Sequence, residues 1–264
     1  DERALEIAAA LGQEVTGDEW RAACALANID APDALVETLL GRHLAGTNER
    51  GPRAGWWFVH GLLRESIERR AREAGREKGH HHIIAEMLRA RGGPHSVERV
   101  GRHLLLAGEY ELAADALLDG ARERIRSGEY RFATALLTDH EEALRRAGVP
   151  ESDRRWCEAW IELSMLEATL DHLEQSQRHA VAAEALARRL GLPNLLAGAL
   201  VARARIDVDR GQAARALLLC DEAVAIYETL PAGRELVKAL LQLGNAALYA
   251  KEWDRVHTAL ERAQ

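Results

Sequence analysis

The sequence has few aromatic residues and few prolines. Aromatic side chains make up 5% of the 264 residues, and only six residues are proline. Aromatic and β-branched residues favour strands, whereas alanine and leucine suit closely packed helices. This composition therefore excludes a mainly β fold. It predicts an all-α protein, and a hydrophobic content of 47% is sufficient for its core.

Long apolar runs, a leader sequence and paired cysteines are also missing. No apolar stretch approaches the length of a membrane span, and the chain does not open with the pattern of a signal peptide. Cys24, Cys157 and Cys220 are odd in number and far apart, which is typical of free thiols in a reducing compartment. We expect a cytoplasmic protein that makes no contact with a membrane. Because the chain begins at Asp1 and stops at Gln264 inside a helical pattern, we expect a piece of a longer protein.

Catalytic motifs are not recognisable. The sequence contains no G-x-x-x-x-G-K-[ST] phosphate loop, no dinucleotide fingerprint, no kinase motif set and no serine nucleophile elbow. His80, His81 and His82 are consecutive, so on a helix they point about 100° apart and cannot clamp one metal ion. We interpret them as a solvated helix start. The segment is expected to be no enzyme, with no catalytic residues, no metal site and no cofactor of its own.

Two stretches of the type G-x-Y-x-x-A, at residues 108–113 and 128–133, organise the second part of the chain. Each predicts a turn followed by a helix start. Further turns are expected at Asp171, Gly211 and Lys251, so that successive turns lie 43, 40 and 40 residues apart. A period near 40 residues indicates stacked helix pairs.

This part of the chain, residues 97–264, resembles tetratricopeptide repeats. Trp160, Leu163 and Ser164 take the places of the family's Trp, Leu and Gly. The period is longer than the family's usual repeat of about 34 residues. The resemblance implies a right-handed α-α superhelix. Small residues occupy the position where the second helix of a pair approaches the first: Ala113, Ala133, Ser176 and Ala216.

The N-terminal part, residues 1–91, has a different pattern. Three helices are expected, over residues 2–11, 17–28 and 30–44. Thr16 and Glu19 form the pattern of a capping box at the start of the second helix, and Asp30 is the expected cap of the third.

A short β-hairpin is expected after these helices. Its strands are residues 44–45 and 56–59, joined by a turn-rich loop at residues 46–52. No other β-structure is predicted. Three helices followed by a hairpin is the order of a winged helix. Two further helices are expected over residues 61–74 and 81–91.

The run Phe58-Val59-His60-Gly61-Leu62-Leu63-Arg64-Glu65 follows the second strand. It is similar to the winged-helix segment of signal-transduction ATPases with numerous domains, or STAND proteins. These include large LuxR-type regulators and bacterial Ser/Thr kinases with fused ATPase modules. In such proteins a nucleotide-binding domain precedes the winged helix and a helical repeat array follows it.

The resemblance implies that ATP or ADP binds to an upstream domain of the parent protein, and that His60 contacts the phosphate of the bound nucleotide. The residue itself leaves two alternatives, namely that His60 caps the following helix or packs in the core.

A winged helix also raises the possibility of DNA binding. The helix expected to enter the groove contains Asp30, Asp33 and Glu37 against Arg42 alone, and the side chains of residues 1–60 sum to about −5. Because DNA affinity depends on Lys and Arg that neutralise phosphates, no nucleic-acid partner is expected. A DNA-binding regulator and a regulatory segment of a kinase stay as alternatives to a signalling scaffold.

The concave face of the repeats is the expected binding surface for a protein or peptide. In stacked helix pairs the first helix of each pair lines this face. Its cations would suit an acidic segment, since Arg engages a carboxylate through two hydrogen bonds. The alternative is that these cations are ordinary solvated side chains. The positions expected to line the face are Arg122, Ile125, Ile161, Met165, Arg205, Val208, Lys238, Asn245 and Leu248.

Overall fold

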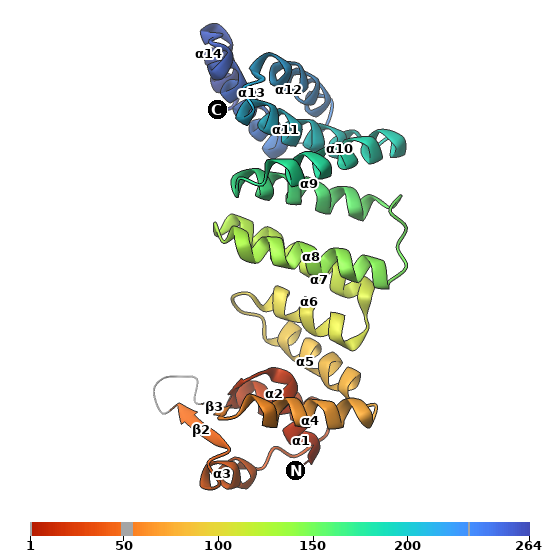
Figure 1. Ribbon diagram of the computed structural model, residues 1–264, viewed down its shortest axis with the longest axis vertical. Helices are drawn as coiled ribbons and strands as arrows, with labels where there is room; N and C mark the ends of the chain where they lie inside the picture. Colours follow the sequence, from red (N-terminus) through yellow and green to blue (C-terminus); the bar gives the residue numbers. More distant parts are fainter. Residues whose placement is uncertain (1, 49–54, 232) are drawn as a thin grey trace. The chain divides into compact units, whose positions relative to one another are not determined.

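The computed structural model describes residues 2–48, 55–231 and 233–264. These residues form fourteen α-helices and three short β-strands, so the expected all-α fold with a small β element is confirmed (Figure 1). They belong to two compact units, Asp1–Ser127 with Thr138–Ala147, and Gly128–Leu137 with Gly148–Gln264. Helix α8 (Tyr130–Arg146) contributes to both units.

The first unit contains the sheet and the helices around it. Helix α5 packs against α1 as well as against α6. The elements are α1 (Glu2–Leu11), β1 (Glu14–Thr16), α2 (Gly17–Leu26), α3 (Asp33–Gly41), β2 (Ala45–Asn48), β3 (Gly55–Phe58), α4 (Gly61–Glu73), α5 (Glu77–Arg91), α6 (Ser96–Ala107) and α7 (Tyr110–Arg126).

The sheet has three antiparallel strands in the order β1-β3-β2. The expected hairpin is formed by β2 and β3, but the prediction of no other β-structure was wrong, because β1 pairs with the other edge of β3. Val15 lies opposite Trp56 and is 2% exposed. A strand of three residues is too short to produce a hydrophobic alternation in the sequence. Most of the loop expected at residues 46–52 lies outside the described residues.

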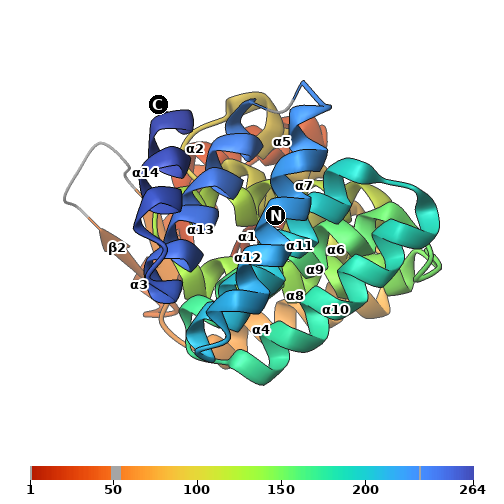
Figure 2. The same cartoon turned by 90° about the horizontal axis from the view of Figure 1, so that it is seen from above.

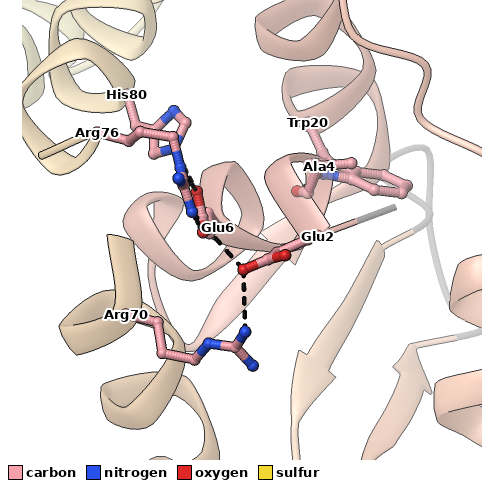
Figure 3. Close-up of polar contacts among 7 residues, drawn as sticks. All are labelled: Glu2, Ala4, Glu6, Trp20, Arg70, Arg76 and His80. Carbon is pink, nitrogen blue, oxygen red and sulfur yellow. Dashed lines mark hydrogen bonds and ion pairs between the residues drawn. The ribbon is translucent and has the colours of Figure 1, made fainter. Parts of the chain in front are cut away.

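Aromatic side chains fill the space between the sheet and α2. Trp20 is fully buried, and its ring centroid lies 5.9 Å from that of Trp56, which in turn lies 4.9 Å from Phe58. Trp20 Nε1 donates to the carbonyl oxygen of Ala4 at 2.7 Å (Figure 3). Trp20, Trp56 and Phe58 thus cover one face of the sheet.

The two helix caps predicted in this region are not formed as expected. Thr16 precedes α2, but its side chain makes no cap hydrogen bond. Glu19 accepts two hydrogen bonds from Arg99, at 2.8 and 2.7 Å. The residue before α3 is Pro32 and not Asp30. Glu19 therefore forms a tertiary ion pair that its position in the sequence did not predict.

Close approach of α6 and α7 depends on glycine. A Cβ atom on Gly101 would lie 2.8 Å from Leu117 Cγ and 3.0 Å from Leu117 N. On α7, a Cβ atom on Gly120 would lie 3.0 Å from the Cα atom of Glu98. Because the second contact is to backbone, a larger residue at either position would push these helices apart.

The second unit consists of antiparallel helix pairs. Helix α9 packs along α10, α11 along α12 and α13 along α14, and the first helices of successive pairs also touch, α9 with α11 and α11 with α13 (Figures 1 and 2). The elements are α9 (Arg154–Thr169), α10 (Leu173–Leu190), α11 (Pro193–Asp209), α12 (Ala213–Glu228), α13 (Gly233–Ala250) and α14 (Trp253–Arg262).

The turns predicted from the sequence are found between the two helices of each pair. Asp171, Gly211 and Lys251 have φ angles of 65°, 73° and 62°, in the left-handed region that ends a helix. Within one pair, Ser164 and Ser176 are fully buried, and Ser176 Oγ donates to the carbonyl oxygen of Ser164 at 2.7 Å. The two small positions that the tetratricopeptide pattern predicts therefore meet.

Candidate protein-binding sites

His60 lies at the junction between β3 and α4 in the first unit. It is the residue before α4, with φ −115° and ψ 117°, and its side chain makes no cap hydrogen bond. Its backbone oxygen accepts from the N–H of Leu63 at 3.0 Å, and its side chain is exposed. Neither alternative for His60, a side-chain cap or a core position, is therefore realised.

Exposed apolar side chains surround His60 in the sequence. Trp57, Val59 and Leu62 are 36%, 46% and 79% exposed. We call these three residues and His60 the β3–α4 junction. Trp57 is held by its neighbour across the sheet, because its indole lies so close to Gly46 that a Cβ atom there would come within 2.4 Å of Trp57 Cζ2. A half-exposed tryptophan in a fixed position is typical of a contact surface.

A buried polar cluster connects α1 with the start of α5 (Figure 3). The Glu6 carboxylate is 1% exposed. Arg76 donates to both of its oxygens, at 2.9 and 2.6 Å, and His80 Nε2 lies 2.8 Å from Oε2. The hydrogen bond from Arg76, against the opposing effect of burial, holds the pKa of Glu6 below its ordinary value. Glu2 adds a more exposed ion pair with Arg70, at 3.1 Å.

The interpretation of the three histidines as a solvated helix start was therefore wrong. His80 and His81 are each 5% exposed. His81 Nδ1 lies 2.9 Å from His103 Nδ1 on α6, so one ring must donate and the other accept. Burial lowers the pKa of His81 to about 4 and that of His103 to about 3. Consecutive helix positions point to different neighbours, so each histidine has a partner of its own.

The positions predicted for one binding face are divided between the two units. Arg122 and Ile125 lie on α7 in the first unit and are partly exposed. Arg122 Nη1 is 3.9 Å from Asp119 Oδ1. The remaining positions lie in the second unit.

Three of those remaining positions face neighbouring helices. Val208 is 3% exposed and belongs to the core between α11, α12, α13 and α14. Met165 packs against buried residues that include Ile206. Ile161 lies against Gly198, where a Cβ atom would be 3.4 Å from Ile161 Cδ1. Val208 is thus no surface residue, because the next helix pair covers it, and Ile161 and Met165 are half-buried in the packing of α9.

The other four positions are accessible. Arg205 is partly exposed, and its Nε lies 3.1 Å from Asp209 Oδ2. Lys238 and Leu248 are exposed and Asn245 is half-buried, all on α13. Sequence reasoning missed Leu241, which is 50% exposed. The signal was present in the sequence, since positions 238, 241, 245 and 248 follow each other at spacings of three, four and three residues and so share one helix face.

Other kinds of site are not formed by the described residues. No three His, Cys, Asp or Glu side chains among them are grouped so that they could hold a metal ion. Cys24, Cys157 and Cys220 are buried free thiols, and burial raises their pKa to about 11, 11 and 12. None of the described helices combines the length and the apolar character needed to cross a bilayer.

Comparison with known proteins gives matches among solved structures. No family model matches the chain, and no curated protein matches it. The structure of BtubC (BKLC) from P. vanneervenii is similar with a TM-score of 0.54 and 17% sequence identity, covering 75% of this chain and 84% of that one. At this identity the likeness shows the fold alone.

A second solved structure is a STAND protein with a tetratricopeptide repeat sensor from Pyrococcus horikoshii. Its TM-score is 0.48 with 15% identity, and the alignment covers 99% of this chain and 44% of that one. The chain thus spans less than half the length of that protein.

Proposed function

We propose that this chain is a regulatory segment of a cytoplasmic, nucleotide-dependent signalling protein of the STAND type. In this proposal residues 1–91 form a winged-helix module and residues 97–264 form tetratricopeptide-like helix pairs. The order α1, β1, α2, α3, β2, β3 supports the first assignment, and the helix pairs with their buried small residues support the second. The run from Phe58 to Glu65 supports the connection with STAND proteins.

The β3–α4 junction is the proposed contact surface for an upstream nucleotide-binding domain of the same protein. The observation on which this depends is that His60 is exposed among apolar side chains and does not cap its own helix. Trp57, Val59 and Leu62 would supply the buried area of the contact. The imidazole of His60 would donate a hydrogen bond to a phosphate of ATP or ADP.

The helix pairs are the proposed binding region for a protein or peptide partner. Arg205 and Lys238 on the first helices of two successive pairs supply positive charge, and Leu248 supplies apolar area. Asp209 already neutralises part of the charge of Arg205. An acidic partner would therefore have to replace that intramolecular ion pair, which favours a carboxylate that Arg205 can bind through two hydrogen bonds.

DNA binding finds no support in the structure of the expected reading helix. Asp33 and Glu37 are exposed one turn apart on α3. Arg21 from α2 lies 3.2 Å from Asp33 and is thereby partly neutralised. Negative charge on this face would repel the phosphates of a duplex.

The proposal is tested by replacing His60 in the full-length protein that contains the nucleotide-binding domain. His60→Ala is expected to weaken ADP retention by about tenfold, the effect of losing one hydrogen bond to a charged group, as measured by calorimetry or filter binding. His257→Ala, an exposed histidine on α14, is the matched control and should retain ADP normally. Equal ADP affinity of the His60→Ala variant and the natural protein would remove His60 from the mechanism. A full-length protein without any nucleotide-binding domain would refute the STAND assignment itself.

A further inference from the structure

A pocket in the first unit lies between the start of α1, the end of α2 and the start of α5. Its volume is about 210 Å³, and it is open to solvent. Basic side chains form one part of its wall, aliphatic side chains form another and two glycines complete it, and none of the described lining residues is acidic. A wall of this kind matches a small molecule that has both an anionic group and an apolar group.

The basic part of the wall consists of Arg3, Arg76 and His80. The Arg76 guanidinium is held in place, because its Nε and Nη2 atoms donate to the buried Glu6 carboxylate (Figure 3). His80 Nε2 lies against the same carboxylate. The Nη1 group of Arg76 makes no hydrogen bond with the described residues, so its two N–H donors remain for a ligand.

Arg3 gives the pocket a positive charge that no described carboxylate balances. It is exposed in the first turn of α1 and forms no ion pair with the part of the chain that the structure describes. The acidic residues on the same helix have other partners, since Glu6 binds Arg76 and Glu2 binds Arg70. A guanidinium of this kind binds a carboxylate through two parallel hydrogen bonds.

Gly79, in the first turn of α5, has no packing reason to be glycine. A Cβ atom there would have no side chain or neighbouring element of the described residues within 4 Å, and its φ angle is not in the left-handed region. Apart from proline, glycine is the least favourable residue in a helix. Its N–H has no carbonyl partner within the helix, and Arg76 before the helix makes no side-chain cap hydrogen bond. The missing side chain therefore lets an oxygen atom of a ligand approach this N–H.

The apolar part of the wall consists of Ala27, Ile29 and Ile83, which are partly exposed. Ile83 lies one turn after Gly79 on the same face of α5. Ile29 is fixed by a hydrogen bond from its N–H to the carbonyl oxygen of Cys24, at 2.9 Å. A short branched alkyl group placed between the two isoleucines would remove their apolar surface from water, which favours binding.

We propose that this pocket binds a small aliphatic carboxylate. Its carboxylate group lies between Arg3 and the Nη1 group of Arg76, with the N–H of Gly79 as a further donor, and its alkyl group lies against Ile29 and Ile83. A free phosphate ion has no apolar surface and would leave the two isoleucines exposed, so the pocket favours the carboxylate. The site shares no residue with the β3–α4 junction.

Titration of the chain with isovalerate, followed by NMR chemical shifts of the backbone amides, tests this assignment. The amide of Gly79 is expected to shift until it saturates, with a dissociation constant on the order of 1 mM, which is the weak affinity that a ligand of few atoms permits. The amide of Gly211, a turn residue of the second unit, should not shift. Absence of a saturable shift at Gly79 would overturn the proposal.

Two related compounds test the two parts of the ligand. Isovaleramide has the same alkyl group without the charge, and inorganic phosphate has the charge without the alkyl group. Each is expected to bind at least about tenfold more weakly than isovalerate, because each loses one of the two kinds of contact. Equal affinity for isovaleramide would show that the arginines do not recognise the ligand, and equal affinity for phosphate would show a general anion contact. Either result would overturn the proposal.

Substitutions test the position of the site, with the amide of Gly75 in the pocket wall as the reporter. Arg3→Ala is expected to raise the dissociation constant of isovalerate at least about tenfold, the effect of losing a charge-assisted contact. Arg89→Ala is the matched control, because Arg89 is exposed on α5 outside the pocket.

Gly79→Leu should prevent binding by filling the pocket. Because leucine favours a helix more than glycine does, the melting temperature of this variant should be no lower than that of the natural chain, so that the loss of binding cannot be due to unfolding. Unchanged isovalerate affinity in Arg3→Ala or in Gly79→Leu would show that the ligand does not lie in this pocket.

Discussion

The first unit and the helix pairs of the second unit are each stabilised by contacts of a different sequence range. In the first unit, Glu6 is bound by Arg76 and His80, which lie 70 and 74 residues away. Among the helix pairs, Ser164 and Ser176 are 12 residues apart. Arg188–Glu222, Arg255–Asp221 and Arg262–Glu228 are each 34 residues apart and connect the second helices of successive pairs.

This difference determines how the stability of each region responds to substitutions. A contact that recurs at a fixed spacing is one of several equivalent contacts between neighbours, so that losing one changes a local interface. The contact between Glu6, Arg76 and His80 joins α1 to the start of α5, which are far apart in the sequence. We therefore expect the first unit to be more sensitive to the loss of single polar groups, and the helix pairs to changes in side-chain volume.

The largest effect is expected at Glu6. Glu6→Ala should lower the free energy of unfolding by about 3 kcal/mol, because it removes a buried carboxylate and leaves His80 without its partner. Urea denaturation followed by circular dichroism measures this loss. Glu2→Ala is the control, since the Glu2 side chain is 59% exposed and exposed ion pairs contribute only about 0–1 kcal/mol. Equal losses for the two variants would contradict the role assigned to the buried cluster.

An intermediate effect is expected from overfilling the helix pairs. Ala204 on α11 is fully buried in the core of the second unit, and Ala204→Leu should cost about 2 kcal/mol because packed helices have no room for the added atoms. Thermal denaturation measures this loss. Ala214→Leu, at an exposed position of α12, should be nearly neutral. If both variants melt at the temperature of the natural chain, close packing of alanine does not determine the spacing of these helices.

The smallest effect is expected from the pair of His81 and His103. Burial depresses both pKa values, to about 4 and about 3, below the ordinary value near 6.5. As the pH falls below about 6.5, the unfolded chain binds protons that the folded chain excludes, so stability decreases with falling pH. Between pH 7 and 6 the two groups together should cost on the order of 1 kcal/mol.

Denaturation at several pH values tests whether this pH dependence of stability comes from His81 and His103. The double variant His81→Leu with His103→Leu should lose less stability between pH 7 and 6 than the natural chain. His257→Gln on α14 should keep the natural slope. An unchanged slope in the double variant would show that the two buried rings are not the source of the pH dependence.

The sequence was sufficient to predict the elements that depend on local patterns. The turns between the paired helices of the second unit lie at the predicted residues, and Asp171, Gly211 and Lys251 have the left-handed backbone that these turns require. Glycine, proline and the periodic small residues act through the chain within a few residues, so their effect can be read without tertiary structure. His60 was also correctly placed between a strand and a helix.

The tertiary structure decided what each side chain contacts. The sequence alone could not show that Glu19 binds Arg99, or that β1 completes the sheet. It could not show that His80 and His81 are buried. The amphipathic pattern places Val208 and Leu248 at equivalent positions of their helices, yet one is covered and the other is exposed. Burial depends on which helix comes next to a face, and that is a property of the assembled fold and not of the helix.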